Sequence, residues 1–187
     1  MFVAIPVPDE VRDAIGEIVS AVRAGGDPDA RDVRWVRLEG LHVTLRFLGP
    51  TRPDRLDEVV AATREAASRT PRFGIVISRA GAFPSPARPR TLWLGVAEGR
   101  SELEAVAGRV DDALAEHGWP RTARPFRAHL TLARSDGIAS GPAVAARLIA
   151  AAGELHTAFT ATSLGVFESI TGRGPARYVK LHDAALG

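Results

Sequence analysis

The sequence predicts an α+β fold of two similar lobes with a cleft between them, and three observations carry this prediction. The 187 residues are enough for one compact domain or for two small lobes that share a core. Segments with strand-like alternation and segments with helix-like periodicity follow one another along the chain. The elements around a His-x-Thr-Leu segment at 42–45 are loosely repeated around a second one at 129–132. An approximate twofold axis would bring these two equivalent strands side by side across the cleft.

The first third of the chain predicts three strands and two helices. A short apolar strand at 2–7 precedes a helix whose apolar residues recur at helical spacing until Gly25 and Gly26 end it. After a polar turn region, segments 33–38 and 41–49 alternate as strands. Pro53 occupies the expected first turn of a second helix.

The rest of the chain continues the same alternation. Strands are expected at 73–79 and 91–97, with the segment 80–90 between them too irregular for regular pairing. A third helix is expected from Ser101, which forms a capping box with Glu104. The remaining expected elements are a strand at 124–134, a helix at 142–153, and closing strands at 155–169 and 176–183 with a turn at 171–175. No linker or low-complexity segment interrupts the chain, so residues 1–187 are expected to form a single two-lobed domain.

The composition indicates a globular protein and excludes several kinds of site. The hydrophobic share is 45% and the charged share is 25%, and no apolar run approaches the roughly 20 residues that span a bilayer. A cytoplasmic location without a membrane partner is therefore expected. Cysteine is absent, which excludes disulfides, thiol nucleophiles and cysteine-ligated metals. The net charge of +2 argues against nonspecific coating of nucleic acid.

The first His-x-Thr-Leu strand has a polar face that carries chemistry. Odd-numbered residues from Leu41 to Phe47 are apolar, so an alternating strand would bury all of them. The opposite face would then present His42, Thr44 and Arg46 together.

The second strand repeats this arrangement. Alternation buries Leu130 and Leu132 and presents Arg127, His129 and Thr131. Two such motifs among five histidines would arise by chance about once in several thousand chains of this composition. Ordinary half-buried strands are thus a poor explanation of the pair.

Two histidines with paired threonines suit the hydrolysis of a phosphodiester. In-line attack needs a base to take a proton from water and an acid to protonate the departing oxygen. With an unperturbed pKa near 6.5, one imidazole can be neutral while the other is charged. A threonine hydroxyl two residues along can donate to a nonbridging phosphate oxygen from the same face.

These two strands resemble those of the two-histidine phosphoesterases, specifically the RNA 2′,3′-cyclic phosphodiesterases once called 2′-5′ RNA ligases. The opening strand and helix, the strand LWLGV and the closing GRGPARYVKL are similar to that family's pattern, in the same order. The resemblance covers nearly the whole chain. It implies a bilobal, pseudo-twofold α+β fold with two antiparallel-rich sheets lining a central cleft and helices outside.

The resemblance also implies the reaction and the roles of single residues. The reaction is hydrolysis of an RNA 2′,3′-cyclic phosphate end to a 2′-phosphate, without metal or other cofactor. His42 matches the proton donor and His129 the proton acceptor, while Thr44 and Thr131 hold phosphate oxygens. Arg134 matches a position that contacts substrate, although strict alternation points it away from His129.

Two further arginines and one departure from the pattern belong to the same strands. Arg46 and Arg127 could bind phosphate or the next nucleotide, or they could be solvated surface charges. Ala128 stands where the family often has proline, which removes no chemical group.

Several alternatives remain open from the sequence. The same site could join RNA ends through a 2′-5′ bond if an RNA hydroxyl replaced water, or the chain could bind nucleotides or RNA ends without turnover. The expected partner is an RNA with a cyclic phosphate end or a cyclic nucleotide, and a monomer is expected. The other histidines lack a second ligand nearby in the sequence, which disfavours metal binding. The aromatic residues that could stack on a base, with core packing as the alternative, are Trp35, Phe83, Trp93, Phe126 and Tyr178.

Overall fold

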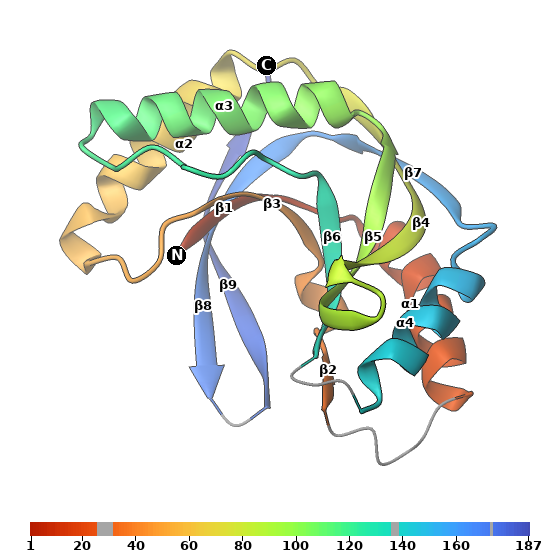
Figure 1. The fold of residues 1–187 in the computed structure, drawn as a ribbon. Helices are drawn as coiled ribbons and strands as arrows, with labels where there is room; N and C mark the ends of the chain where they lie inside the picture. Colours follow the sequence, from red (N-terminus) through yellow and green to blue (C-terminus); the bar gives the residue numbers. More distant parts are fainter. Residues whose placement is uncertain (26–31, 136–138, 173) are drawn as a thin grey trace.

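The structure is a computed structural model that describes residues 1–25, 32–135, 139–172 and 174–187 (Figure 1). The helices are α1 (Asp9–Ala24), α2 (Leu56–Ser68), α3 (Arg100–Glu116) and α4 (Gly141–Ala151), with the short 3-10 helices η1 (Leu38–Gly40) and η2 (Pro53–Arg55). The strands are β1 (Phe2–Pro6), β2 (Val33–Trp35), β3 (His42–Phe47), β4 (Phe73–Ser85), β5 (Arg88–Glu98), β6 (His129–Ser135), β7 (His156–Ala161), β8 (Ser163–Gly172) and β9 (Gly174–Ala185).

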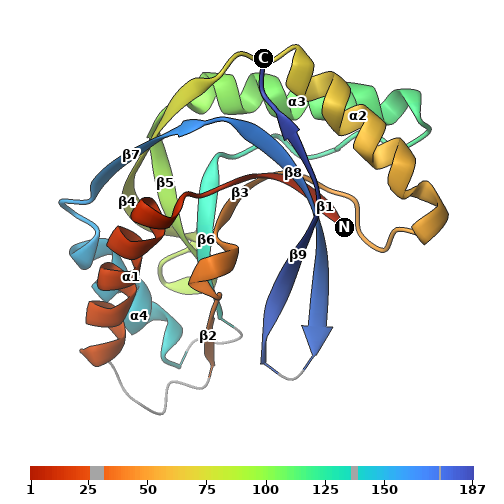
Figure 2. The ribbon, with the colours of Figure 1, turned by 180° about the vertical axis from the view of Figure 1, so that it is seen from behind.

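The strands form one antiparallel sheet made of two four-stranded halves. Its order is β7-β4-β5-β6-β3-β1-β8-β9, and β2 pairs with β6 outside this path. The halves meet where β3 pairs with β6 through Val43 and Leu130. Figures 1 and 2 show that the sheet curls into an open half-barrel. The predicted two-lobed α+β fold is therefore confirmed, and a single short junction joins the two expected sheets.

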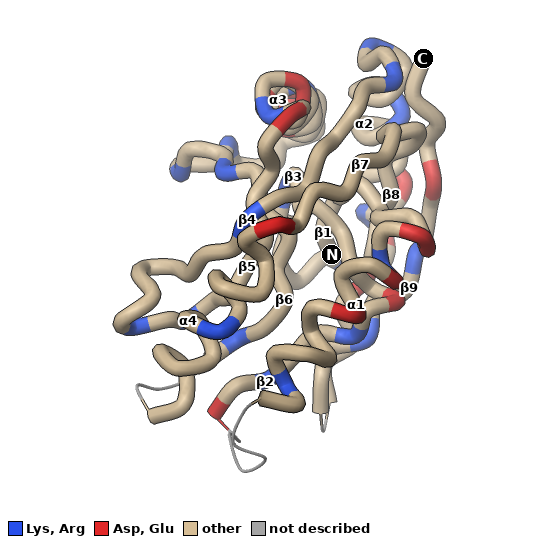
Figure 3. The backbone as a smooth tube through the Cα atoms, turned by 90° about the vertical axis from the view of Figure 1, so that its right-hand side faces the viewer, with Lys and Arg blue, Asp and Glu red and all other residues tan. Residues whose placement is uncertain are grey.

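Each half of the sheet is covered by a pair of helices. Helix α4 contacts β4 and β5 and packs on α1, whereas α2 packs on α3 and contacts β8 and β9. Helix α3 also contacts β3 from the helical side. Figure 3 shows that charges of both signs are distributed over both halves of the chain. The helices thus leave the opposite, concave face of the central strands free for a site.

The helical spacing of the sequence explains which faces are buried. In α1 the buried residues are Val11, Ile15, Val19 and Val22, which recur every three or four positions on one side. Packing of this apolar stripe, rather than local propensity, supplies most of a helix's stability. No helix within the described ranges is both long enough and apolar enough to span a membrane.

Segment 80–90 is mostly paired strand, so its prediction as an irregular connection is wrong. Strands β4 and β5 form one long hairpin whose pairing continues to Ser85 and Arg88. Three register shifts along the hairpin absorb the local irregularity, and Pro84 lies opposite Pro89. A β-bulge accommodates residues that regular pairing would reject. Pro84 and Pro89 therefore lie in bulged, paired strand and not in a loop.

Other boundaries differ from the sequence prediction for local reasons. Helix α3 begins at Arg100 after Gly99, whose φ of +83° suits glycine, and Ser101 contacts Glu102 instead of capping the helix. The strand expected at 124–134 starts only at His129, and the segment 155–169 divides into β7 and the first part of β8. The expected turns near 25–32 and 171–175 include residues 26–31 and 173, which lie outside the described residues.

Candidate active site

The junction between the two halves places both His-x-Thr motifs on one face. Because Val43 pairs with Leu130 in an antiparallel ladder, His42 lies opposite Thr131 and Thr44 lies opposite His129. Val43 and Leu130 are completely buried, so their neighbours point to the other, concave side. Diagonal residues on one face of such a pair lie about 7–8 Å apart. His42 and His129 therefore stand at opposite corners of an approximate square whose other two corners are Thr44 and Thr131. We call this arrangement the motif square.

Both imidazoles are oriented by the same backbone contact. His42 Nδ1 lies 2.7 Å from the carbonyl oxygen of Gly40, and His129 Nδ1 lies 2.7 Å from that of Arg127. A carbonyl oxygen only accepts, so each Nδ1 carries a proton and donates it. Each Nε2 remains as the nitrogen that can exchange a proton with a ligand.

The residue that supplies the carbonyl to His42, Gly40, also lies in close contact with the ring of Tyr178. A Cβ built on Gly40 would lie 2.7 Å from Tyr178 Cδ2, which is too close for any other residue. The Tyr178 ring in turn stands edge-on to His42, with their centroids 5.0 Å apart. The ring of His42 is thus held from two sides.

Burial lowers the pKa of both histidines below the usual value of 6.5. Desolvation is the largest cause for His42; the Gly40 hydrogen bond opposes it, and the charge of His129 lowers the pKa further. Desolvation also dominates for His129, opposed by the Arg127 carbonyl and assisted by the charge of Arg134. In the free protein each ring is therefore more readily neutral, and a proton on one disfavours a proton on the other.

Matching β-bulges change the alternation three residues after each histidine. Strand β1 pairs Ala4 with Thr44 and Val3 with Arg46, so Leu45 is skipped. Strand β5 pairs Trp93 with Thr131 and Leu92 with Ala133, so Leu132 is skipped. An extra residue reverses which face the following side chains occupy.

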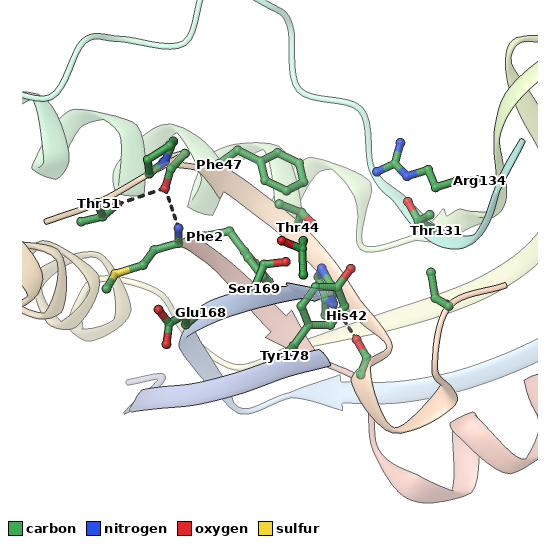
Figure 4. A pocket seen from close by; sticks show the side chains of 16 residues that line it. Phe2, His42, Thr44, Phe47, Thr51, Thr131, Arg134, Glu168, Ser169 and Tyr178 are labelled. Atoms are coloured by element: carbon green, nitrogen blue, oxygen red, sulfur yellow. Dashed lines mark hydrogen bonds between the residues drawn. The ribbon is translucent and has the colours of Figure 1, made fainter. Parts of the chain in front are cut away.

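The bulge in β6 explains the position of Arg134. Alternation alone pointed this side chain away from His129, but the skipped Leu132 returns it to the same face as Thr131. Figure 4 shows Arg134 and Thr131 beside each other. The Arg134 guanidinium donates to Thr91 Oγ1 at 2.7 Å and its charge acts on His129. A cation therefore stands at one end of the site.

The bulge in β3 has the opposite effect on Arg46, so the expectation that it shares the face of His42 is wrong. Its Nε lies 2.9 Å from Asp111 Oδ1 on α3, an ion pair without a directed hydrogen bond. The same guanidinium also donates to the Phe47 and Pro120 carbonyls. Arg46 borders the site but is held toward the helical side.

Arg127 precedes β6, so strand alternation does not place it. Its carbonyl accepts from His129, and its guanidinium lies over the ring of Phe83, 5.5 Å from the centroid. The Phe83 ring also stands edge-on to His129, with their centroids 5.3 Å apart. Arg127 therefore lies beside His129, and both side chains line one cavity.

Aromatic rings pack around His42 more densely than the sequence indicated. Phe2 stacks on His42 with centroids 4.6 Å apart, and Phe167 stacks on Phe2 at 5.3 Å. Of the five aromatic candidates, Tyr178 and Phe83 contact the two histidines, and Trp93 packs on Phe83 at 5.1 Å. The remaining candidates are Phe126, which lines a cavity, and Trp35, which packs on the core.

Two cavities meet at the motif face. The first, of about 560 Å³, is lined by His42, Thr44, Thr131 and Arg134 among others, and we call it the His42 cavity (Figure 4). The second, of about 1000 Å³, is lined by His129, Thr44 and Phe83 among others, and we call it the His129 cavity. Both include Thr44 and Phe47, so the two spaces adjoin between the histidines.

The His129 cavity is the more basic of the two. Its lining contains four arginines, which are Arg46, Arg90, Arg124 and Arg127. Two carboxylates, Glu104 and Asp111, offset part of this charge. Its walls therefore include residues of two proline- and arginine-containing segments, 83–90 and 122–127.

Comparisons with known proteins identify the family and the fold. A sequence profile of the 2′-5′ RNA ligase superfamily matches residues 7–183. An RNA 2′,3′-cyclic phosphodiesterase of Aeropyrum pernix is 34% identical over 155 residues, covering 81% of this chain and 85% of that protein. One of Archaeoglobus fulgidus is 34% identical over 134 residues, covering 72% and 71%. The crystal structure of E. coli LigT complexed with 3′-AMP is 26% identical with a TM-score of 0.71, covering 99% of this chain and 96% of that one.

Proposed function

The chain belongs to the 2′-5′ RNA ligase superfamily, and from this premise we propose that it is an RNA 2′,3′-cyclic phosphodiesterase. The family predicted from the two motifs is thereby confirmed. Relatives named RNA 2′,3′-cyclic phosphodiesterase support the activity, and the nucleotide complex of E. coli LigT supports the binding of a nucleotide. The observation that carries the proposal is the diagonal arrangement of His42 and His129 across one antiparallel pair.

Acid–base catalysis by the two histidines accounts for the hydrolysis. His129 Nε2 takes a proton from a water molecule, whose oxygen forms a bond to phosphorus. The bond from phosphorus to the ribose O3′ breaks on the opposite side, and His42 Nε2 protonates that oxygen. A 2′-phosphate and a free 3′-hydroxyl result, and the two rings return to their starting states by proton exchange with solvent. Opposite corners of the motif square suit this in-line path.

Thr44 and Thr131 are proposed to hold the nonbridging phosphate oxygens. Each lies opposite a histidine in the ladder and is half-buried on the concave face. Their hydroxyls can donate to oxygens on which charge builds up during attack. Arg134, at the end of the His42 cavity, adds a positive charge toward the same oxygens. Arg46 and Arg127 are assigned at most to contacts with RNA beyond the terminal phosphate.

The product of a defined RNA tests the proposal. An oligonucleotide with a 2′,3′-cyclic phosphate end is expected to gain a 2′-phosphate, at the same rate with and without a chelator. No step above uses a metal, and no group of three potential ligand side chains gathers among the described residues. Chromatography of the product, with synthetic 2′- and 3′-phosphate standards, is the measurement. A longer RNA would indicate ligation, bound but unaltered RNA would indicate a binding module, and loss of rate with chelator would contradict metal independence.

The lowered pKa values of His42 and His129 predict a bell-shaped dependence of the reaction rate on pH, with its maximum on the acidic side of pH 6.5. The donor fails when pH rises above its pKa, and the acceptor fails when pH falls below its own. Because burial lowers both pKa values, kcat/KM is expected to peak below pH 6.5. A bound phosphate anion raises the pKa of a facing imidazole, so kcat should peak at a higher pH than kcat/KM. Initial rates across pH measure both quantities, and a kcat/KM that still increased above pH 6.5 would contradict desolvation as the dominant influence on the two rings.

The remaining features of the proposed enzyme follow from the sequence. We propose that residues 1–187 act as one two-lobed domain, because the catalytic pair is completed only where the halves meet. A monomer in the cytoplasm, with RNA ends or cyclic nucleotides as its partners, remains the expectation.

A further inference from the structure

Residues 119–128 connect α3 to β6 without a helix or strand of their own, and we call them the connecting segment. Figure 1 shows that this segment runs back along α3 before it enters β6. It ends beside His129, and its residue Arg127 supplies the carbonyl oxygen that accepts from His129 Nδ1 at 2.7 Å. The orientation of His129 therefore depends on what holds the connecting segment in place.

The equivalent carbonyl at His42 is held by local backbone. Gly40 belongs to the 3-10 helix η1, in which the N–H groups of Gly40 and Leu41 each donate to a carbonyl three residues earlier, both at 3.1 Å. Such a closed turn fixes its own carbonyls. The connecting segment has no such turn, because residues 123–126 make no hydrogen bond within the described part of the chain. Contacts with other elements must therefore fix it.

Asp111 on α3 anchors the connecting segment by hydrogen bonds. Its carboxylate accepts from the Thr122 N–H at 3.2 Å and from the Thr122 hydroxyl at 3.0 Å. It also lies 2.9 Å from Arg46 Nε, and the same guanidinium donates to the Pro120 carbonyl. The Asp111 and Arg46 side chains are only 17% and 13% exposed, so solvent screens this ion pair less than a surface pair. Thr122 is thus the last hydrogen-bonded anchor before Arg127.

Other contacts of the connecting segment direct its backbone less strongly. The rings of Trp119 and Phe126 pack against the core, but apolar packing is nondirectional and does not determine where a following carbonyl points. Arg121 pairs with Asp112, yet both side chains are 64% exposed, and exposed ion pairs contribute little. A directed hydrogen bond to a fixed helix is the contact that can set the path of the backbone.

We propose that Asp111 is a positioning residue for His129. It holds Thr122, and through Thr122 it keeps the Arg127 carbonyl against Nδ1 of the ring. This inference rests on the proposed function and adds to it the residue that keeps the acceptor in its working form. The hydrogen bond at Nδ1 decides which nitrogen of a neutral imidazole carries the proton. With that proton on Nδ1, the lone pair of Nε2 can take a proton from water, and with the proton on Nε2 it cannot.

The tautomer of His129 tests this proposal without any substrate. Nitrogen NMR of the histidine rings at alkaline pH, where the rings are neutral, distinguishes a proton on Nδ1 from one on Nε2, and loss of a signal in His129→Ala assigns it. Asp111→Ala is expected to move the His129 proton partly to Nε2 and to leave His42 unchanged. Asp111→Asn keeps an acceptor oxygen for Thr122 without the charge, so it should retain the wild-type tautomer. Asp112→Ala, which removes the neighbouring carboxylate of α3, is the matched control.

The rate of hydrolysis of adenosine 2′,3′-cyclic phosphate provides the second measurement. Asp111→Ala is expected to lower kcat about tenfold and to leave KM little changed, because Thr44 and Thr131 still hold the phosphate while the acceptor is misaligned. Asp111→Asn and Asp112→Ala should keep nearly the wild-type kcat. A fall in kcat for Asp111→Asn as large as for Asp111→Ala, with the wild-type tautomer retained, would mean that charge matters instead of position, and would overturn the proposal.

The tautomer separates failure of this proposal from failure of the proposed function. A folded Asp111→Ala protein with the wild-type tautomer at His129, or with equal changes at His42 and His129, would overturn the positioning role. Wild-type protein that left the cyclic phosphate intact would overturn the proposed function, and the spectra would still decide whether Asp111 orients the ring. If Asp111→Ala does not fold, Thr122→Val at an exposed position takes its place. It should shift the His129 tautomer in the same direction, and an unchanged tautomer would again count against the proposal.

Discussion

Replacing either His42 or His129 by alanine is expected to lower kcat for a 2′,3′-cyclic phosphate by at least about a hundredfold. Each ring performs a proton transfer that no neighbouring side chain in the square can supply, because the other two corners are threonine hydroxyls. The two losses should not multiply in the double variant, since one transfer without the other completes no reaction. Single-turnover rates with excess protein would measure all three variants.

The control for the histidine variants is His156→Ala. His156 is exposed at the start of β7, far along the sheet order from β3, and its loss should leave kcat unchanged. Thermal unfolding of each variant would show whether the fold persists. Full turnover in a folded His129→Ala protein would defeat the assignment of the acceptor.

Shortening Leu130 to alanine is expected to lower the free energy of unfolding by about 2–5 kcal/mol. Leu130 is completely buried and pairs with Val43 at the junction between the two halves of the sheet. Its removal leaves a cavity behind the catalytic face, where β3 and β6 pair. The loss is a large part of the roughly 5–15 kcal/mol by which domains are usually stable.

Denaturant unfolding provides the measurement for Leu130→Ala. The matched control is Ile149→Ala on α4, where a side chain of similar size is 37% exposed and should cost much less. Equal losses in the two variants would mean that the junction contributes no more to stability than a half-exposed helix position does.

Periodicity predicted the helices and the central motif because these depend on local patterns. Burial of Val43 and Leu130 follows directly from strand alternation, and it places His42 and His129 on the opposite face. A loose internal repeat then predicted that the two motifs would be neighbours. Side-chain pattern and repeat were together sufficient to predict the four corners of the site.

Residues beyond the motifs were not predictable, because bulges depend on the partner strand. Nothing in the order of residues around Leu45 and Leu132 shows that β1 and β5 skip them. That skip reversed the expected faces of Arg46, Phe47 and Arg134. The carbonyls of Gly40 and Arg127, which orient the two imidazoles, could not be predicted either, because every residue has a backbone carbonyl whatever its type.

The shared bulge position has a consequence for how a substrate is read. Two motifs on a near-twofold frame, with the same skipped residue after each, would by themselves accept a phosphodiester with either polarity. Phe47 at one position and Arg134 at its equivalent break that equivalence, as do the stacked rings of Phe2 and Phe167 at His42 where His129 has the edge-on ring of Phe83. The few side chains that differ between the repeats therefore determine which oxygen enters and which departs. The repeated backbone supplies only the chemistry that both motifs share.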